Sequence, residues 1–241
     1  GERVAGWPEY HVPDWAKGLS AEERQPKTLA MIKTAVNRYK NSPAVEMWQV
    51  ENEPLFYWAK LKEIEQTYMV KTQISPEFLK REVDLVRSLD GRPVIITDSG
   101  ELSDWKQASL AGDYFGTTLY RFFWQRIWND FGARLYYSYL PPFTFISPAY
   151  YNNKAANLGL DTDKVFVMEL QSELWIRNEA LKDSSPDLQA RIFGVRQFKQ
   201  NLDFARRTGF ARAYLWGAEW WYYLKVNGHP EIWDEAKKLW Q

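Results

Sequence analysis

The stretch Val45-Glu46-Met47-Trp48-Gln49-Val50-Glu51-Asn52-Glu53-Pro54 decides the fold class of this chain. Its first six residues are mostly apolar and rich in β-branched and aromatic side chains, which is typical of a buried strand. Polar residues and a proline follow at once, so the strand is expected to end there. The stretch therefore predicts that Glu53 lies where a buried strand meets the loop after it.

A second stretch has the same organisation. The apolar run Val165-Phe166-Val167-Met168 ends in Glu169, followed by Leu170-Gln171. Three further runs predict strands, although a glycine interrupts the second of them: 93–97, 114–120 and 211–216. The sequence thus predicts about five strands, two of which deliver a glutamate to their carboxyl ends.

Helical patterns separate these strands. Ser20 and Glu23 form a potential capping box, Ser75-Pro76 and Ser185-Pro186 are typical helix starts, and Pro230 opens a terminal helix. Gly91 and Gly209 are expected to end the second and third helices. The predicted buried faces are Leu29, Ile32, Val36 and Tyr39 in the first helix, Leu188, Ile192, Val195, Leu202 and Ala205 in the long third one, and Ile232, Ala236 and Leu239 in the last.

Alternating strands and helices with nearly continuous apolar strands predict a parallel sheet covered by helices. Periodicity alone does not separate an open, doubly wound sheet from a barrel. The length of 241 residues favours one domain over 1–241. The segment 121–160, rich in Tyr, Phe and Pro, is longer than a normal connection and is expected to form a lid or a side wall.

Composition excludes several classes of function. Lys+Arg and Asp+Glu both number 31, which removes the charge signature of a nucleic-acid or anionic-membrane binder. The chain has 0 cysteines and 2 histidines, so thiolate or histidine-rich metal sites are not expected. No apolar run approaches the roughly 18 residues of a membrane span, and no secretory signal opens the chain. The compartment is undetermined, with the cytoplasm favoured.

Two carboxylates are what glycoside hydrolysis needs, one to protonate the leaving oxygen and one to attack the anomeric carbon. Asn52-Glu53-Pro54 after a strand resembles the acid/base motif of the clan A glycoside hydrolases, which are retaining (β/α)-barrel enzymes. In that clan the motif ends the fourth strand and the nucleophile ends the seventh. The resemblance implies an incomplete TIM-type (β/α) barrel in which about five parallel strands correspond to strands 4–8.

The same resemblance implies a role for each matching residue. Asn52 matches the asparagine that binds the sugar 2-hydroxyl, Glu53 the acid/base, and Glu169 the nucleophile. Tyr120, after Thr117-Thr118-Leu119, matches a tyrosine that hydrogen-bonds this nucleophile. Trp216 matches the tryptophan that floors the subsite of the reacting sugar. His11, in Trp7-Pro8-Glu9-Tyr10-His11, is expected to line the pocket.

Other interpretations stay open at this point. Glu173 is a rival to Glu169, and Glu51 is either a second polar partner in the site or a surface charge. The segment Glu219-Trp220-Trp221 forms either a further subsite or a loop anchor. Tyr120 and Trp216 also fit a plain packing role, which is the usual role of aromatic residues.

The resemblance implies a retaining β-glycosidase that works by double displacement and needs no metal or organic cofactor. Glu169 must be ionised to attack, whereas Glu53 must hold a proton, and a nearby anion favours that proton. Relative to the family, the first two βα units are absent, so the chain is either a naturally shortened barrel or a fragment of a longer protein. We therefore expect slow turnover, broad specificity, and a homo-oligomer, such as a dimer, that covers the exposed strand edge. The alternatives are a non-catalytic carbohydrate-binding or scaffold protein and an interaction module formed by that edge.

Overall fold

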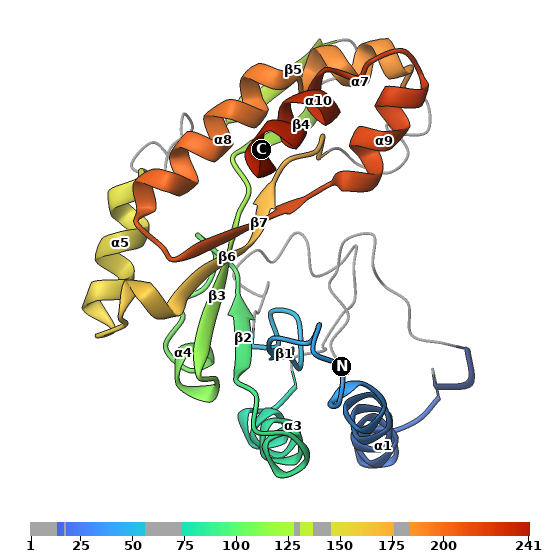
Figure 1. The fold of residues 1–241 in the computed structure, drawn as a ribbon, viewed down its shortest axis with the longest axis vertical. Coiled ribbons are helices and arrows are strands. Elements are labelled where there is room, and N and C mark those ends of the chain that lie inside the picture. Colours follow the sequence, from blue (N-terminus) through green and yellow to red (C-terminus); the bar gives the residue numbers. More distant parts are fainter. Residues whose placement is uncertain (1–13, 17, 56–73, 128–130, 137–145, 176–183) are drawn as a thin grey trace. The chain divides into compact units, whose positions relative to one another are not determined.

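The computed structural model describes residues 14–241 except residues 17, 56–73, 128–130, 137–145 and 176–183. Five strands form one sheet in the order β1-β2-β3-β6-β7, and the pairs β1–β2, β2–β3 and β6–β7 are parallel. Strands and helices alternate along the chain, as Figure 1 shows. This is the element order of an incomplete TIM-type barrel with five parallel strands, so the predicted fold class is confirmed. The sheet strands are β1 (Trp48–Gln49), β2 (Val94–Asp98), β3 (Tyr114–Leu119), β6 (Val165–Gln171) and β7 (Arg212–Trp216).

The chain divides into two compact units, Gly1–Thr117 and Thr118–Gln241. Besides its strands, the first unit contains η1 (Asp14–Ala16), α1 (Ala21–Tyr39), α3 (Pro76–Leu89) and α4 (Ala108–Ala111). The second contains the antiparallel pair β4 (Phe122–Ile127) and β5 (Phe131–Tyr136), then α5 (Pro148–Asn157), η5 (Thr162–Lys164), α7 (Pro186–Ile192), α8 (Val195–Thr208), α9 (Ala218–Val226), α10 (Glu231–Lys237) and η6 (Lys238–Trp240).

Helix α1 begins as its capping box predicts. The Ser20 hydroxyl accepts from the Glu23 N–H, and the Glu23 carboxylate accepts from the Ser20 N–H. Two donors that a helix start leaves without partners are thus satisfied. Of the predicted face, Ile32 and Val36 are buried, whereas Tyr39 is 49% exposed. The buried face of α1 is therefore narrower than the spacing of its apolar residues predicted.

Helix α3 packs beside α1 and contributes more buried side chains to the first unit than α1 does. Ser75 caps it and Pro76 is its first residue, as predicted. Its buried side chains include Phe78, Leu79 and Val86. The helix ends at Leu89 with an extended Asp90, so an extended cap, and not a left-handed Gly91, ends it.

Strand β1 is shorter than predicted, and it is not a buried strand, because Trp48 is partly exposed and Gln49 is exposed. A side chain anchors it. The indole Nε1 of Trp48 donates to the Asp90 carboxylate at 3.0 Å, and Arg92 forms an ion pair with the same carboxylate at 2.6 Å. Desolvation acts to raise the pKa of Asp90, but these Trp48 and Arg92 contacts outweigh it and hold the pKa below its usual value. The contact ties β1 to the turn that precedes β2.

The long helix expected after Ser185-Pro186 is two helices. Gly194 adopts an extended backbone between α7 and α8, and its N–H donates to the Gln197 side chain, which caps the second helix. Phe193 in the break is 1% exposed and packs edge-on against Phe122. The single face predicted across both helices is therefore wrong: Leu188 is 38% exposed. Gly209 does end α8 in the left-handed region, at φ 73°.

The C-terminal helices enclose an aromatic core. Trp220 and Trp221 are 8% and 5% exposed. Their indole N–H groups donate to Gln189 and to the backbone of Ser172, at 2.8 and 2.7 Å. These contacts make the pair an anchor of α9 and not a sugar subsite. The core cluster is Leu174, Ile192, Phe193, Phe198, Trp220, Trp221, Leu224, Ile232 and Ala236.

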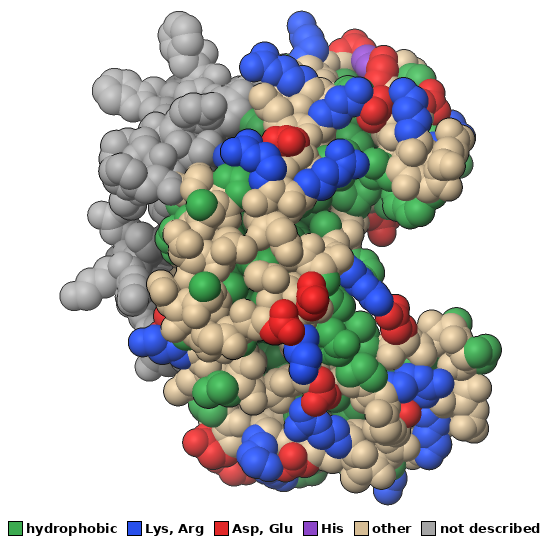
Figure 2. Space-filling model, turned by 60° about the vertical axis from the view of Figure 1, so that its left-hand side comes forward, with side chains coloured by type: hydrophobic (Ala, Val, Ile, Leu, Met, Phe, Trp, Pro, Cys, Tyr) green, Lys and Arg blue, Asp and Glu red, His purple; other side chains and the backbone are tan. Residues whose placement is uncertain are grey.

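The described surface carries charges of both signs. Figure 2 shows basic and acidic side chains interspersed on one face, in keeping with equal numbers of the two over the sequence. Among the described residues, no helix is long and apolar enough to cross a membrane. In the 121–160 segment, the described parts form β4, β5 and α5.

Candidate active site

The Asn52-Glu53-Pro54 loop follows β1 directly in the first unit. Val50 and Glu51 are buried, at 8% and 4% exposure, and Asn52 and Glu53 are partly exposed. The burial of Glu51 excludes its interpretation as a surface charge. The chain thus passes from two buried residues directly to two accessible polar side chains.

Thr97, the fourth residue of β2, organises this loop. Its Oγ1 accepts from the Glu53 backbone N–H at 2.9 Å and donates to Asn52 Oδ1 at 3.3 Å. Gln49 Nε2 donates to Thr97 Oγ1 at 3.3 Å and to Asn52 Oδ1 at 3.4 Å. Glu53 itself has φ 45°, which is unfavourable for a residue with a Cβ. Strained backbone of this kind is found where the surroundings hold it, often at functional sites.

In the second unit, Glu169 lies at an irregularity within β6 and not at its end as predicted, because the strand continues to Gln171. Val167 pairs with Ala213, and Leu170 pairs with Leu215. Two residues of β6, Met168 and Glu169, therefore lie opposite one residue of β7, which is a β-bulge. A bulge re-aims side chains, and both bulge residues are partly exposed in a strand that is otherwise buried.

Tyr120 reaches this glutamate. Its hydroxyl donates to Glu169 Oε2 at 2.9 Å. Its ring lies 5.3 Å from that of Trp175, measured between centroids. The two contacts fix both ends of the tyrosine, so its hydroxyl is directed at one carboxylate oxygen.

Gln171 anchors the segment that carries Tyr120. Its Oε1 accepts from the N–H groups of Arg121 and Phe122, both at 2.8 Å, and its Nε2 donates to the Phe122 carbonyl at 2.6 Å. From the other side, Asn201 Nδ2 donates to the Gln171 carbonyl at 2.7 Å. Both side chains are 0% exposed, so these bonds form away from water, where losing one is costly.

Trp216 ends β7 beside the same strand. It pairs with Gln171, its carbonyl accepts from the Ser172 N–H at 3.0 Å, and its side chain is 42% exposed. Gly217 follows at φ 125°, and a Cβ there would lie 2.5 Å from the Glu173 Cβ. A glycine is therefore required for the chain to turn after Trp216.

The structure thus forms two local groups. Asn52 and Glu53 share a hydrogen-bonded loop in the first unit, and Tyr120, Glu169 and Trp216 lie around the end of β6 in the second. His11 lies outside the described residues. Glu173, the rival of Glu169, follows β6 and is packed beside Gly217.

Thr97, Gln171 and Trp175 were not among the residues predicted for the site. One signal was present for Thr97 and Gln171: each is a polar residue that closes an apolar run expected to be a buried strand. A buried polar side chain needs a partner, which makes such a residue a candidate for holding a loop. Nothing in the sequence distinguishes Trp175 from the other tryptophans.

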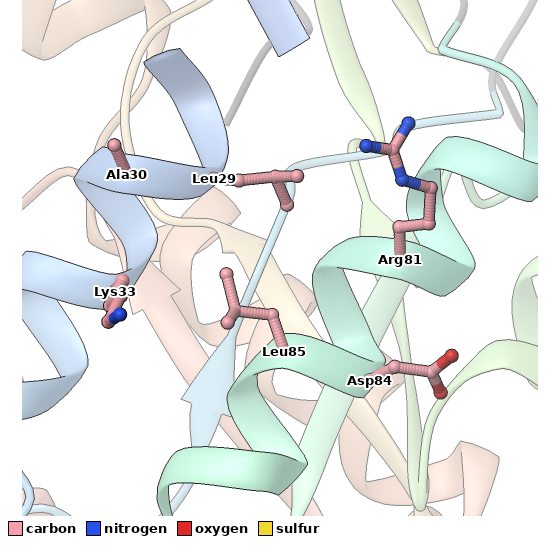
Figure 3. Close-up of a pocket in the computed structure, with 6 residues that line it drawn as sticks. All are labelled: Leu29, Ala30, Lys33, Arg81, Asp84 and Leu85. Carbon is pink, nitrogen blue, oxygen red and sulfur yellow. The ribbon is translucent and has the colours of Figure 1, made fainter. Parts of the chain in front are cut away.

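A groove elsewhere in the first unit is separate from these groups. It lies between α1 and α3 and has a volume of about 490 Å³, and Figure 3 shows the side chains that line it. All of them come from the two helices, and none is a candidate site residue: Leu29, Ala30, Lys33, Arg81, Asp84 and Leu85. In the described part of the chain, no three His, Cys, Asp or Glu side chains are grouped to hold a metal ion.

Comparison with known proteins supports the fold. No protein-family model matches the sequence, and no curated protein does. A solved FMN-binding β-glucuronidase from Facaelibacterium prausnitzii L2-6 is similar with a TM-score of 0.51 at 15% identity, over 82% of this chain and 26% of that one. The β-glucuronidases of Bacteroides uniformis and Ruminococcus gnavus both have a TM-score of 0.48, at 12% and 15% identity. The match to the Bacteroides uniformis protein covers 82% of this chain and 22% of that one. The match to the Ruminococcus gnavus protein covers 86% of this chain and 30% of that one.

This chain spans about a quarter of the length of the first of these proteins. At such identities the likeness concerns the fold alone. It agrees with the incomplete barrel described above.

Proposed function

We propose that this protein is a retaining β-glycosidase in which Glu169 is the nucleophile and Glu53 the acid/base. The observation that carries the proposal is the 2.9 Å hydrogen bond from Tyr120 to Glu169 at the bulge of β6. A hydroxyl donor to a carboxylate oxygen favours the ionised form, which is the form that a nucleophile needs. The partial exposure of Glu169 permits contact with a substrate.

In the first step, a Glu169 oxygen forms a bond to the anomeric carbon while the bond from that carbon to the leaving oxygen breaks. The proton of the Glu53 carboxylic acid passes to the leaving oxygen, and a glycosyl ester of Glu169 remains. In the second step, Glu53 takes a proton from water, whose oxygen attacks the same carbon and releases Glu169. The sugar leaves with its original configuration.

Asn52 and Trp216 complete the proposed site. Asn52 supplies an amide group for the sugar 2-hydroxyl, and Trp216 supplies an accessible apolar ring for the C–H face of the sugar. A retaining mechanism requires the carboxyl groups of Glu53 and Glu169 to lie about 5–5.5 Å apart in the active protein. The proposal includes slow turnover, broad specificity and self-association.

The decisive experiment compares hydrolysis of a panel of aryl β-glycosides by the wild type, Glu53→Gln and Glu169→Ala. A β-glucuronide belongs in the panel because the similar solved structures are β-glucuronidases. We expect both substitutions to abolish turnover, and azide to restore part of it in Glu169→Ala by replacing the missing nucleophile. Glu173→Gln is the matched control and is expected to keep its activity.

The outcomes separate the candidate functions. Wild-type turnover that survives in Glu169→Ala but not in Glu173→Gln would transfer the nucleophile to Glu173. A folded wild type without turnover on any glycoside would contradict the enzyme. Sugar binding by such a protein, measured by calorimetry, would support the non-catalytic carbohydrate-binding alternative.

A further inference from the structure

Thr97 is a buried polar residue with an unusual concentration of contacts. It is 1% exposed, yet its single hydroxyl accepts from the Glu53 N–H and donates to the Asn52 side chain. A threonine hydroxyl has one hydrogen to donate and two lone pairs. The third partner, Gln49 Nε2 at 3.3 Å, uses the second lone pair. The hydroxyl is thus fully used, and all of its partners lie on β1 or on the loop after it.

The loop needs such a contact because of its backbone. The φ of 45° at Glu53 places the Cβ close to the following carbonyl, and an unrestrained loop would relax toward negative φ. A rotation about the backbone at Glu53 re-aims its side chain, because the side chain is attached at that Cα. The Thr97 hydroxyl holds the N–H of the same residue, and with Asn52 Oδ1 it holds the neighbouring side chain.

We propose that Thr97 is a positioning residue whose hydroxyl holds Glu53 in the orientation needed for proton transfer to the leaving group. This inference rests on the proposed function, since it takes Glu53 as the acid. It assigns Thr97 no contact with the substrate. The competing explanation is that Thr97 only satisfies a buried loop, in which case its loss would weaken the fold without altering proton donation in particular.

The test uses the leaving group to isolate proton donation. 2,4-Dinitrophenolate is a stable anion, so it leaves with little help from an acid. Phenolate is more basic, so its departure depends on a proton from the acid. The value of kcat/KM reports the first step alone. It is measured for 2,4-dinitrophenyl and phenyl glycosides of the same sugar, with wild type, Thr97→Val and Thr97→Ser. Valine keeps the shape of threonine without the hydroxyl, and serine keeps the hydroxyl without the methyl group.

We expect Thr97→Val to lower kcat/KM for the phenyl glycoside by about 10- to 100-fold, and for the dinitrophenyl glycoside by less than about 3-fold. Thr97→Ser should stay within about 3-fold of the wild type on both substrates. Thermal unfolding is measured alongside for every variant. If Thr97→Val does not fold, Thr97→Ala is compared with Thr97→Ser, because these two differ from each other only by the hydroxyl.

Equal losses on the two substrates, or a serine variant as impaired as the variant without the hydroxyl, would overturn the role of Thr97 and leave the proposed function standing. A wild type without turnover on either substrate would overturn both proposals. Selective loss on the phenyl glycoside with recovery in Thr97→Ser would support both.

Discussion

Replacing Tyr120 by phenylalanine removes one oxygen atom from the proposed site and leaves the rest of the residue in place. The ring keeps its packing against Trp175, and the following backbone keeps its three hydrogen bonds to Gln171. What is lost is the 2.9 Å hydrogen bond to Glu169 Oε2. Tyr120→Phe is therefore a specific probe of how that carboxylate is held.

The size of the effect follows from the charge of the acceptor. A hydrogen bond to a charged group contributes about 1.5–3 kcal/mol, and each 1.36 kcal/mol is a factor of ten in rate. We therefore expect kcat/KM for an aryl β-glycoside to fall by about 10- to 150-fold. KM should change little, because the hydroxyl acts on the nucleophile and not on the bound sugar.

Tyr222→Phe is the matched control. Tyr222 lies on α9, is 54% exposed, and has a ring contact with Trp233 that phenylalanine preserves. It should retain the wild-type rate. Steady-state kinetics on the glycoside that the wild type hydrolyses best, with unfolding curves for each variant, make the comparison. A change below about 2-fold in Tyr120→Phe, in a protein that needs Glu169, would refute the reasoning, because a bond to a charged group should contribute more.

Two further predictions concern stability and assembly. Gly217→Ala should destabilise the fold by about 1–3 kcal/mol more than Gly228→Ala, as measured by urea unfolding. Both glycines have positive φ, but only the new Cβ at position 217 meets Glu173. Equal losses of stability in the two variants would show that Glu173 moves aside. Self-association predicts a mass above 28.5 kDa by light scattering that falls toward that value on dilution, and a monomeric mass at all concentrations would contradict it.

The best predicted elements are those whose signals are local. The capping box at Ser20 and Glu23, the Ser-Pro start of α3 and the left-handed Gly209 all act within one helical turn, and each is present in the structure. Such signals survive because no distant residue competes with them. The strand that carries Glu169 was also predicted, since its apolar run is continuous, but β6 continues past Glu169 to Gln171.

The errors occur where packing competes with periodicity. One helix was predicted after Ser185-Pro186, because the apolar spacing continues through residues 193–194. The structure breaks there because Phe193 is buried between Phe122 and Trp220, and Gly194 tolerates the extended backbone that this requires. A glycine and a local cap made the break possible, but the partners of Phe193 come from distant parts of the chain.

The sequence by itself determined the order of strands and helices, and the placement of Glu53 after β1 and of Glu169 near the carboxyl end of β6, because apolar patterning and turn residues act between neighbours in the chain. Tertiary structure alone decided how these glutamates are held. The bulge of β6 depends on its register with β7, and Tyr120 meets Glu169 across 49 residues of sequence. Thr97 meets the backbone of Glu53 across 44. Contacts over such separations form only when the strands have paired, so a single sequence carries no local signal for them.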